Sequence, residues 1–348
     1  MPDKITLSVA GRRVEAFTDY HIDSDLYTAG DAFSLTMSDP GVVINDGARC
    51  QLSVNDRLEM TGIVDRVTEA NSKQGSTVTV EGRDLMGLVV DSYVEQFVTL
   101  ENITLKALAE QLLATVPFIN RKAIEYQAGI AGAAAAKTGS NSLLDTAQNK
   151  AQVEPGQTIF EVLKDYAMSR GAMFFSLPNG TFVFGRPKAK GKPVFKLTRR
   201  RDGRGNNVIE GRRIRDISQR YSKIIVLGQQ QGSDPLGAEE INTKAEILDD
   251  QVPFYKPFVT VNNNDGKSPA EHARLLLERQ RAMGLQLIYK VRGHSQGSRN
   301  WTINELCEIE DEKFGIFGTF LIYGRALNLD KKDGPITEVR LGLPGVIK

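Results

Sequence analysis

The chain has 348 residues, of which 41% are hydrophobic and 25% charged, a composition typical of a soluble globular protein with two or three domains. Its net charge of +1 argues against DNA binding by wholesale neutralisation of phosphates. The sequence contains no apolar run long enough for a membrane span, and charges interrupt the N-terminus where a signal peptide needs an apolar core. We therefore expect the protein to begin in a cytoplasm. With only two cysteines, Cys50 and Cys307, neither a disulfide framework nor a cysteine-based metal cluster is expected.

Residues 1–93 read as a succession of short strands. Apolar and polar residues alternate, most clearly over 77–80, and glycine, asparagine and aspartate separate the runs. This pattern predicts a first small antiparallel β-barrel.

Residues 94–205 predict an α+β domain. An apolar stripe predicts a helix over 104–116, which Pro117 ends. Residues 127–152 are rich in alanine, glycine and serine and lack bulky groups, so they predict a mobile loop.

Residues 153–186 predict a helix that leads into a hairpin. Thr158 and Glu161 have the spacing of a capping box, and Gly171 can end the helix in a left-handed conformation. The two following β-rich runs are joined by 178–180, Pro-Asn-Gly, which is a strong turn signal. The unit carries no obvious catalytic residue, so its role is interpreted as architectural.

The rest of the chain predicts a second β-barrel, made of 206–232 and 285–348. Residues 233–284 form an insertion, with a helix over 268–283 that Ser268 and Glu271 cap. The predicted fold class is therefore a β-rich α+β protein with two small antiparallel β-barrels and α+β insert domains between them.

The two strand-rich regions suggest an internal repeat. Cys50, Gly62 and Gly75 recur at nearly constant separation as Cys307, Gly318 and Gly334. The alternative is that any two antiparallel meanders look alike.

Three short motifs suggest enzymes but lack the required length or context. Residues 293–297, Gly-His-Ser-Gln-Gly, match the nucleophile elbow of hydrolases, but no helical stripe follows and no histidine comes after His294. Residues 131–138 end in Lys-Thr like a phosphate loop, but alanine occupies both glycine positions. The Gly-Arg-Gly at 203–205 is too short for a dinucleotide fingerprint.

Other candidate residues favour structural roles. The basic loop of Arg199, Arg200, Arg201 and Arg204 is interpreted as a solvated loop or interface rim rather than a nucleic-acid site. Trp301 is interpreted as a barrel anchor rather than a sugar platform. The neighbouring carboxylates Asp249 and Asp250 have no spaced partner, so a glycosidase is not supported.

Three stretches carry a resemblance to a known family. They are Gly-x-Thr-x-x-Glu-x-Leu at 156–163, Thr-Gly-Ile-Val-Asp-Arg-Val at 61–67, and the polar pattern over 207–229 that includes Tyr221. Together they resemble the tail baseplate hub proteins of Mu-like contractile-tailed phages and prophages. The resemblance is strongest at 55–93, 153–186 and 206–230 and returns in the last 60 residues, whereas 127–152 departs from it.

The resemblance implies a homotrimeric hub of the virion baseplate, assembled in the cytoplasm of the bacterial host. It implies contacts with the tail tube protein and the central spike protein, and a channel for DNA in transit during genome injection. It implies no catalytic residue, cofactor or metal site, and it assigns no binding residues. The motif positions are interpreted as holding the fold; they are Gly156, Thr158, Glu161, Gly171, Gly180 and Tyr221.

Three alternatives stay open. One is the hub of a type VI secretion-like machine, although that family continues into a β-helical spike and this sequence ends at Lys348. The second is a tail-associated polysaccharide or cell-wall hydrolase, which would need an acid/base pair or a metal site. The third is a host glycan-binding module, which exposed aromatic clusters would favour; aromatic residues make up 7% of the chain.

Overall fold

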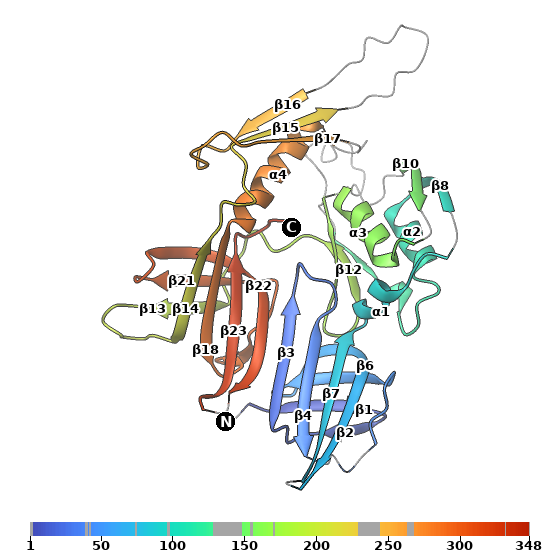
Figure 1. Ribbon diagram of the computed structural model, residues 1–348, viewed down its shortest axis with the longest axis vertical. Helices are drawn as coiled ribbons and strands as arrows, with labels where there is room; N and C mark the ends of the chain where they lie inside the picture. The colour runs from blue at the N-terminus through green and yellow to red at the C-terminus, as the bar shows by residue number, and fades with distance from the viewer. Residues whose placement is uncertain are drawn as a thin grey trace.

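The computed structural model describes residues 3–38, 41, 43–73, 75–95, 98–127, 148–153, 156–169, 171–228, 244–262, 268–330 and 332–347. The protein is a β-rich α+β fold with few helices, built on one large and mostly antiparallel sheet (Figure 1). No helix in these ranges is long and apolar enough to cross a membrane.

The N-terminal half-sheet is made from residues 5–84. Its strand order is β2-β1-β5-β6-β7-β4-β3. The strands are β1 (Ile5–Val9), β2 (Arg12–Val14), β3 (Asp19–Asp25), β4 (Ala32–Ser38), β5 (Arg49–Val54), β6 (Arg57–Ser72) and β7 (Gly75–Asp84). Alternate residues of these strands form one buried core, which also receives Leu327 from far along the chain.

The C-terminal half-sheet surrounds a second core that contains Tyr289, Trp301 and Cys307. Its strand order is β13-β21-β22-β23-β18-β14. The strands are β13 (Phe195–Arg199), β14 (Val208–Arg215), β18 (Leu285–Arg292), β21 (Glu305–Asp311), β22 (Ile316–Asp330) and β23 (Gly334–Gly342). A small hairpin of β19 (Ser295–Gln296) and β20 (Arg299–Asn300) adjoins them.

The two half-sheets share one topology. Taken in chain order, the strands β1, β3, β4, β5, β6 and β7 occupy the same positions as β13, β14, β18, β21, β22 and β23. The long strands β6 and β22 even carry their bulges at equivalent places, between Val64 and Arg66 and between Ile322 and Gly324. One difference is that β1 runs antiparallel to β5, whereas β13 runs parallel to β21.

The register corrects one pair of the expected repeat. Cys50 lies opposite Gly62, and Cys307 lies opposite Phe320 rather than Gly318. Matching glycine to glycine was misleading, because position in a sheet is set by partners across the strands and not by residue type.

The half-sheets are joined into one continuous sheet rather than standing apart. The second half of β22 pairs with β3, with Leu327 opposite Ile22. Among the described strands no pairing closes either half, so the two small barrels stay a prediction. The ends of the C-terminal half-sheet do approach each other, since the amide N–H of Asn207 donates to the carbonyl of Thr198 at 3.2 Å.

The helical insert follows β7. It contains α1 (Met86–Asp91), β8 (Val98–Ile103), α2 (Leu105–Leu112), η1 (Arg121–Ala123), β9 (Glu125–Tyr126), β10 (Gln148–Val153), α3 (Ile159–Ser169), β11 (Met173–Ser176) and β12 (Phe182–Gly185). The capping box of α3 is confirmed: the Thr158 N–H donates to Glu161 at 2.9 Å, and the Glu161 N–H donates to Thr158 Oγ1 at 3.1 Å. The hairpin is confirmed too, with Gly180 at φ +81° in its turn.

Two boundaries in this insert differ from expectation. The helix expected over 104–116 begins where predicted, with Thr104 as its N-cap, but α2 ends at Leu112 and turns carry the chain to Pro117. The prediction of a loop over 127–152 is wrong at its C-terminal end, because 148–153 form β10, which pairs with β8. The rest of that loop, 128–147, lies outside the described residues. A strand of polar residues such as Gln148 and Lys150 has no apolar periodicity to reveal it.

A separate small sheet caps one end of the molecule. It consists of β15 (Lys223–Gly228), β16 (Lys244–Leu248) and β17 (Pro257–Asn262), and α4 (Pro269–Met283) packs on it (Figure 1). The predicted capping box of α4 is confirmed at Ser268 and Glu271. Residues 223–228 were expected in the second barrel but belong here, because an apolar strand does not reveal its partner.

Candidate functional site

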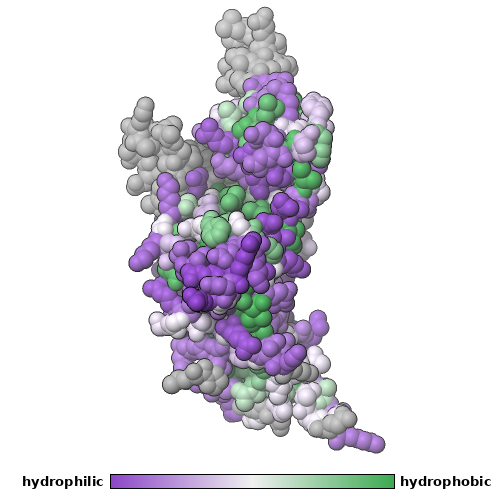
Figure 2. Space-filling model, turned by 90° about the vertical axis from the view of Figure 1, so that its left-hand side faces the viewer, coloured by the Kyte–Doolittle hydropathy of each residue, from purple (hydrophilic) through white to green (hydrophobic). Residues whose placement is uncertain are grey.

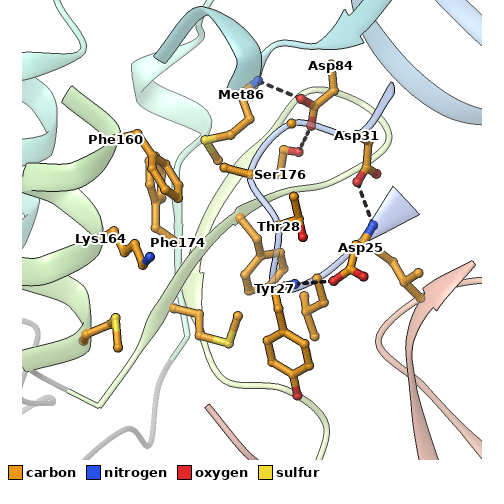
Figure 3. Close-up of a pocket in the computed structure, with 17 residues that line it drawn as sticks. Asp25, Tyr27, Thr28, Asp31, Asp84, Met86, Phe160, Lys164, Phe174 and Ser176 are labelled. Atoms are coloured by element: carbon orange, nitrogen blue, oxygen red, sulfur yellow. Dashed lines mark hydrogen bonds between the residues drawn. The ribbon is translucent and has the colours of Figure 1, made fainter. Parts of the chain in front are cut away.

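A small cavity lies where the N-terminal half-sheet meets the helical insert (Figure 3). Asp31 from the β3–β4 turn and Asp84 from the end of β7 approach each other there, and Lys164 reaches in from α3 on the opposite side. Asp84 accepts hydrogen bonds from the Met86 N–H at 3.1 Å and from the hydroxyl of Ser176. Asp31 accepts one from the Asp25 N–H at 3.0 Å.

The environment of the two carboxyls favours their protonated forms. Burial, together with the neighbouring charge of Asp84, raises the pKa of Asp31 to about 7. Burial raises the pKa of Asp84 to about 6, although its hydrogen bonds act in the opposite direction. The pair therefore holds a proton near neutral pH and forms a polar link between the sheet and the insert.

The cavity cannot hold a substrate. Its volume of about 40 Å³ accommodates a few water molecules at most, whereas ligand pockets are several times larger. Within the described parts of the chain, no group of three or more histidine, cysteine or acidic side chains could hold a metal ion. The sequence did not single out either carboxyl, because nothing local connects two aspartates on different strands.

Replacing Asp31 by asparagine should stabilise the protein above pH 7 by about 2 kcal/mol and leave its stability near pH 4 unchanged. A carboxyl with a raised folded pKa contributes stability that is complete below its unfolded pKa and lost as the pH rises through about 6 to 7. Asparagine stays neutral and keeps the acceptor for Asp25. Urea unfolding at pH 4 and pH 8 measures the difference, with the exposed Asp46→Asn as control. Equal pH slopes for Asp31→Asn and the parent would contradict the role of the pair.

The hydrolase motif is not an elbow in the structure. Ser295 begins the short hairpin of β19 and β20, with no helix after it. The ring of buried His294 is already bonded on both sides, by the Tyr20 hydroxyl at 2.7 Å and the Thr337 hydroxyl at 3.0 Å. Burial lowers the pKa of His294 to about 4, so the ring is neutral at pH 7. The motif therefore serves to pack the junction of the half-sheets.

The basic loop faces acidic partners within the chain. Arg200 forms a two-pronged pair with Glu310, at 2.7 and 3.0 Å, and Arg199 lies 3.4 Å from Asp311 and stacks on Phe314. The Arg201 N–H donates to Glu312, while Arg204 lies at 4.0 Å from Asp202. These contacts fit the structural interpretation of the loop better than a nucleic-acid site.

The remaining candidates are also structural. Trp301 is 1% exposed and stacks on Phe195, with ring centroids 4.7 Å apart, in the core of the C-terminal half-sheet. Asp249 is clamped between Arg220 at 2.7 Å and Arg281 at 2.8 Å, which links α4 to the chain before β15. The residues 131–138 lie outside the described ranges.

The motif positions sit in turns, caps and packing contacts. Gly156, Gly171 and Gly180 all have positive φ, which an ordinary side chain would strain. Tyr221 packs on Phe258 at 5.0 Å beside α4. The interpretation that they hold the fold stays a prediction.

The junction of the half-sheets contains a buried ion pair. Arg325 of β22 donates to Glu59 of β6 at 2.6 Å, and the two side chains are 3% and 5% exposed. Asn300 completes the network, since its amide donates to Glu59 at 2.6 Å and to the Val54 carbonyl at 2.8 Å. Nearer the edge, Arg340 of β23 lies 2.7 Å from Asp23 and 3.4 Å from Asp25. The half-sheets are thus held in one fixed relation.

Two family models match the sequence. Residues 4–84, the N-terminal half-sheet, match the N-terminal domain of the Mu phage baseplate assembly protein GpP-like family. Residues 220–275, the small sheet with α4, match the third domain of NMB1110-like tail proteins. A comparison with curated proteins gave no match.

Solved structures share the fold over nearly the whole chain. The tail protein from Neisseria meningitidis MC58 is 26% identical, with 99% of this chain and 98% of that chain covered at a TM-score of 0.84. The 43 kDa tail protein of prophage MuSo2 from Shewanella oneidensis is 22% identical, with 99% and 100% covered at 0.76. The E. coli type VI secretion component c3393 is 11% identical, with 97% and 76% covered at 0.60. Residues 4–84 and 220–275 are thus similar to domains of Mu phage baseplate and tail proteins, which confirms the resemblance seen in the sequence.

Proposed function

We propose that the protein is a structural part of a phage tail baseplate, a trimeric hub that joins the six-fold tail tube to the three-fold spike. The observation that carries the proposal is the shared strand order of the two half-sheets. A ring of three chains presents six similar units, so it can contact a six-fold tube on one face and a three-fold spike on the other. The matches to baseplate and tail families support this assignment.

In this hub each half-sheet acts as one barrel-like unit of the ring. The buried Glu59–Arg325 pair and the β22–β3 pairing hold the two units of one chain in a fixed relation. The ring encloses a channel through which DNA passes without being read, and the protein belongs to the virion. Its function is mechanical, so no catalytic residue is assigned.

The hub of a type VI secretion-like machine is the second candidate, favoured by the shared fold with the E. coli component. Partner binding distinguishes the two. A phage hub should bind phage tail tube and spike proteins, whereas a type VI hub should bind the tube and spike proteins of a secretion machine. Co-sedimentation of purified pairs shows which partners are bound.

Light scattering should find a species of three times the chain mass of 38.3 kDa. Averaged electron micrographs of that species should show a ring with six similar lobes, because the two half-sheets of each chain have the same shape at low resolution. A monomer at every concentration, with no ring on the grids, overturns the trimeric hub.

A further inference from the structure

Within this chain, one edge of β22 pairs with one edge of β3. The corresponding edges of their counterparts in the other half-sheet, β6 and β14, are not paired with any described strand. Along one edge, β22 pairs first with β21 and then, over Gly324–Asn328, with β3. Its counterpart β6 pairs with β5 over residues 57–63, but no described strand lies on that edge over 66–70. Likewise β14, the counterpart of β3, pairs with β18 alone among the described strands. The two edges lie on opposite sides of the molecule, with β14 on the left and β6 on the right (Figure 1).

The correspondence of β3 with β14 follows residue by residue from the sheet. In the N-terminal half-sheet, one row across the strands runs through Val64, Gly82, Phe33 and Ile22. In the C-terminal half-sheet, the row that starts at the same bulge runs through Ile322, Leu341, Leu287 and Arg213. Ile22 and Arg213 are therefore counterparts.

The ends of the two strands agree with this register. The Asp25 carboxylate accepts from the Tyr27 N–H at 2.9 Å, and the Asp216 carboxylate accepts from the Ser218 N–H at 2.7 Å. Both strands thus end in the same turn, in which an aspartate side chain bonds the backbone two residues on.

Resting on the trimeric hub proposed above, we propose that β14 of one copy pairs antiparallel with residues 66–70 of β6 in a second copy, in the register of β3 and β22. Counted from the equivalent bulges of β22 and β6, Leu327 corresponds to Glu69 and Gly324 to Arg66. Leu327 lies opposite Ile22 within the chain, so Glu69 lies opposite Arg213 of the second copy. Gly324 lies opposite Asp25, so Arg66 lies opposite Asp216. Thr68 then lies opposite Ile214.

Charge complementarity supports this pairing. The β14 edge carries Arg212, Arg213 and Arg215. The two facing pairs of the proposed register that are charged on both strands, Glu69–Arg213 and Arg66–Asp216, join opposite charges. Opposite charges on facing strands favour one register. Charges on a free edge also prevent indiscriminate sheet pairing before assembly. The side of the molecule that carries β14 is mainly hydrophilic with small apolar patches, as expected for a surface exposed before assembly (Figure 2).

An exposed apolar residue supports it as well. Within the chain, the Leu26 N–H donates to the Tyr323 carbonyl at 2.7 Å, and Leu26 is 4% exposed. Its counterpart after β14 is Ile217, which is 38% exposed in the single chain. In the proposed contact the Ile217 N–H meets the carbonyl of Asp65 and its side chain becomes covered.

Engineered cysteines test the register. Thr68→Cys with Ile214→Cys should form a disulfide between copies under mild oxidation, because facing residues of antiparallel strands have Cα atoms within disulfide range. Dimer and trimer bands should appear on non-reducing gels and vanish on reduction. Thr68→Cys with Glu210→Cys is the control, since four residues of offset place the sulfurs roughly 13 Å apart. The native cysteines are buried.

Charge reversal tests the contact independently. Glu69→Arg should abolish the trimer at concentrations where the parent is trimeric, and adding Arg213→Glu should restore it. Glu110→Arg, an equal change of charge on the exposed face of α2, should have no effect. Thermal unfolding shows whether each variant is folded. If the variant with Arg213→Glu does not fold, the cysteine cross-linking experiment alone decides whether β14 pairs with β6 of a second copy.

The two failures are distinguishable. A trimer that is insensitive to Glu69→Arg and cross-links no better at Ile214 than at Glu210 overturns this interface and leaves the trimeric hub standing. A parent protein that is monomeric throughout overturns both.

Discussion

Arg325→Met should lower the free energy of unfolding by about 3–5 kcal/mol. The substitution leaves the carboxylate of Glu59 buried without its cation, 5% exposed between the two half-sheets. It also removes the hydrogen bond from the guanidinium to the Trp301 carbonyl. Urea unfolding at pH 7 measures the loss, which is a large share of the stability of a typical domain.

The double variant Glu59→Gln, Arg325→Met is the informative control. It removes both charges and keeps an acceptor for the Asn300 amide, so it should recover much of the loss. If its loss instead equals the sum of the two single losses, the two side chains do not act as a pair. Because the pair joins the half-sheets, Arg325→Met should also weaken the proposed trimer.

Gly62→Ala should lower the free energy of unfolding by about 3 kcal/mol. Gly62 lies in β6, between Cys50 of β5 and Asp84 of β7. A Cβ atom there would lie 1.9 Å from the Arg83 carbonyl oxygen, so β6 and β7 would have to separate. Since glycine-to-alanine changes elsewhere stabilise by about 0.4–1 kcal/mol where the backbone tolerates them, the sign of the effect is diagnostic.

Gly87→Ala is the matched control for this prediction. The atoms nearest to a Cβ at Gly87 belong to the side chain of Arg83, at 3.2 Å, so the crowding there is far milder than at Gly62. Thermal unfolding of both variants under one set of conditions should separate them by several degrees. Equal melting temperatures would mean that β6 and β7 adjust without cost.

The glycine also explains why the repeat was misaligned by sequence. Gly62 is needed because the backbone of β7 approaches closely, whereas its true counterpart, Phe320, has room for a ring. Gly318 is a glycine for another reason, its φ of +135°. Residue identity thus followed local needs that differ between the half-sheets, while strand order and bulge position were kept.

Local signals predicted the elements that depend on neighbouring residues. The capping boxes at Thr158 and Ser268, the hairpin at Gly180 and the alternating strands of residues 1–93 were readable because their partners lie within a few residues. The family resemblance was readable for the same reason, since its motifs are short.

The contacts between segments far apart in the sequence could not be predicted from it. The second half of β22 lies against β3, β15 lies in a different sheet from β14, and Asp31 meets Asp84, although no local pattern marks any of these pairings. A strand exposes the same backbone groups whatever its partner, so its sequence does not identify the strand it pairs with. The pKa of a carboxyl is raised only once the fold has buried it, and burial depends on distant segments. The sequence therefore determined the caps, turns and strand periods, whereas only the packing of the whole chain determined which edges of the described strands are paired and which are not.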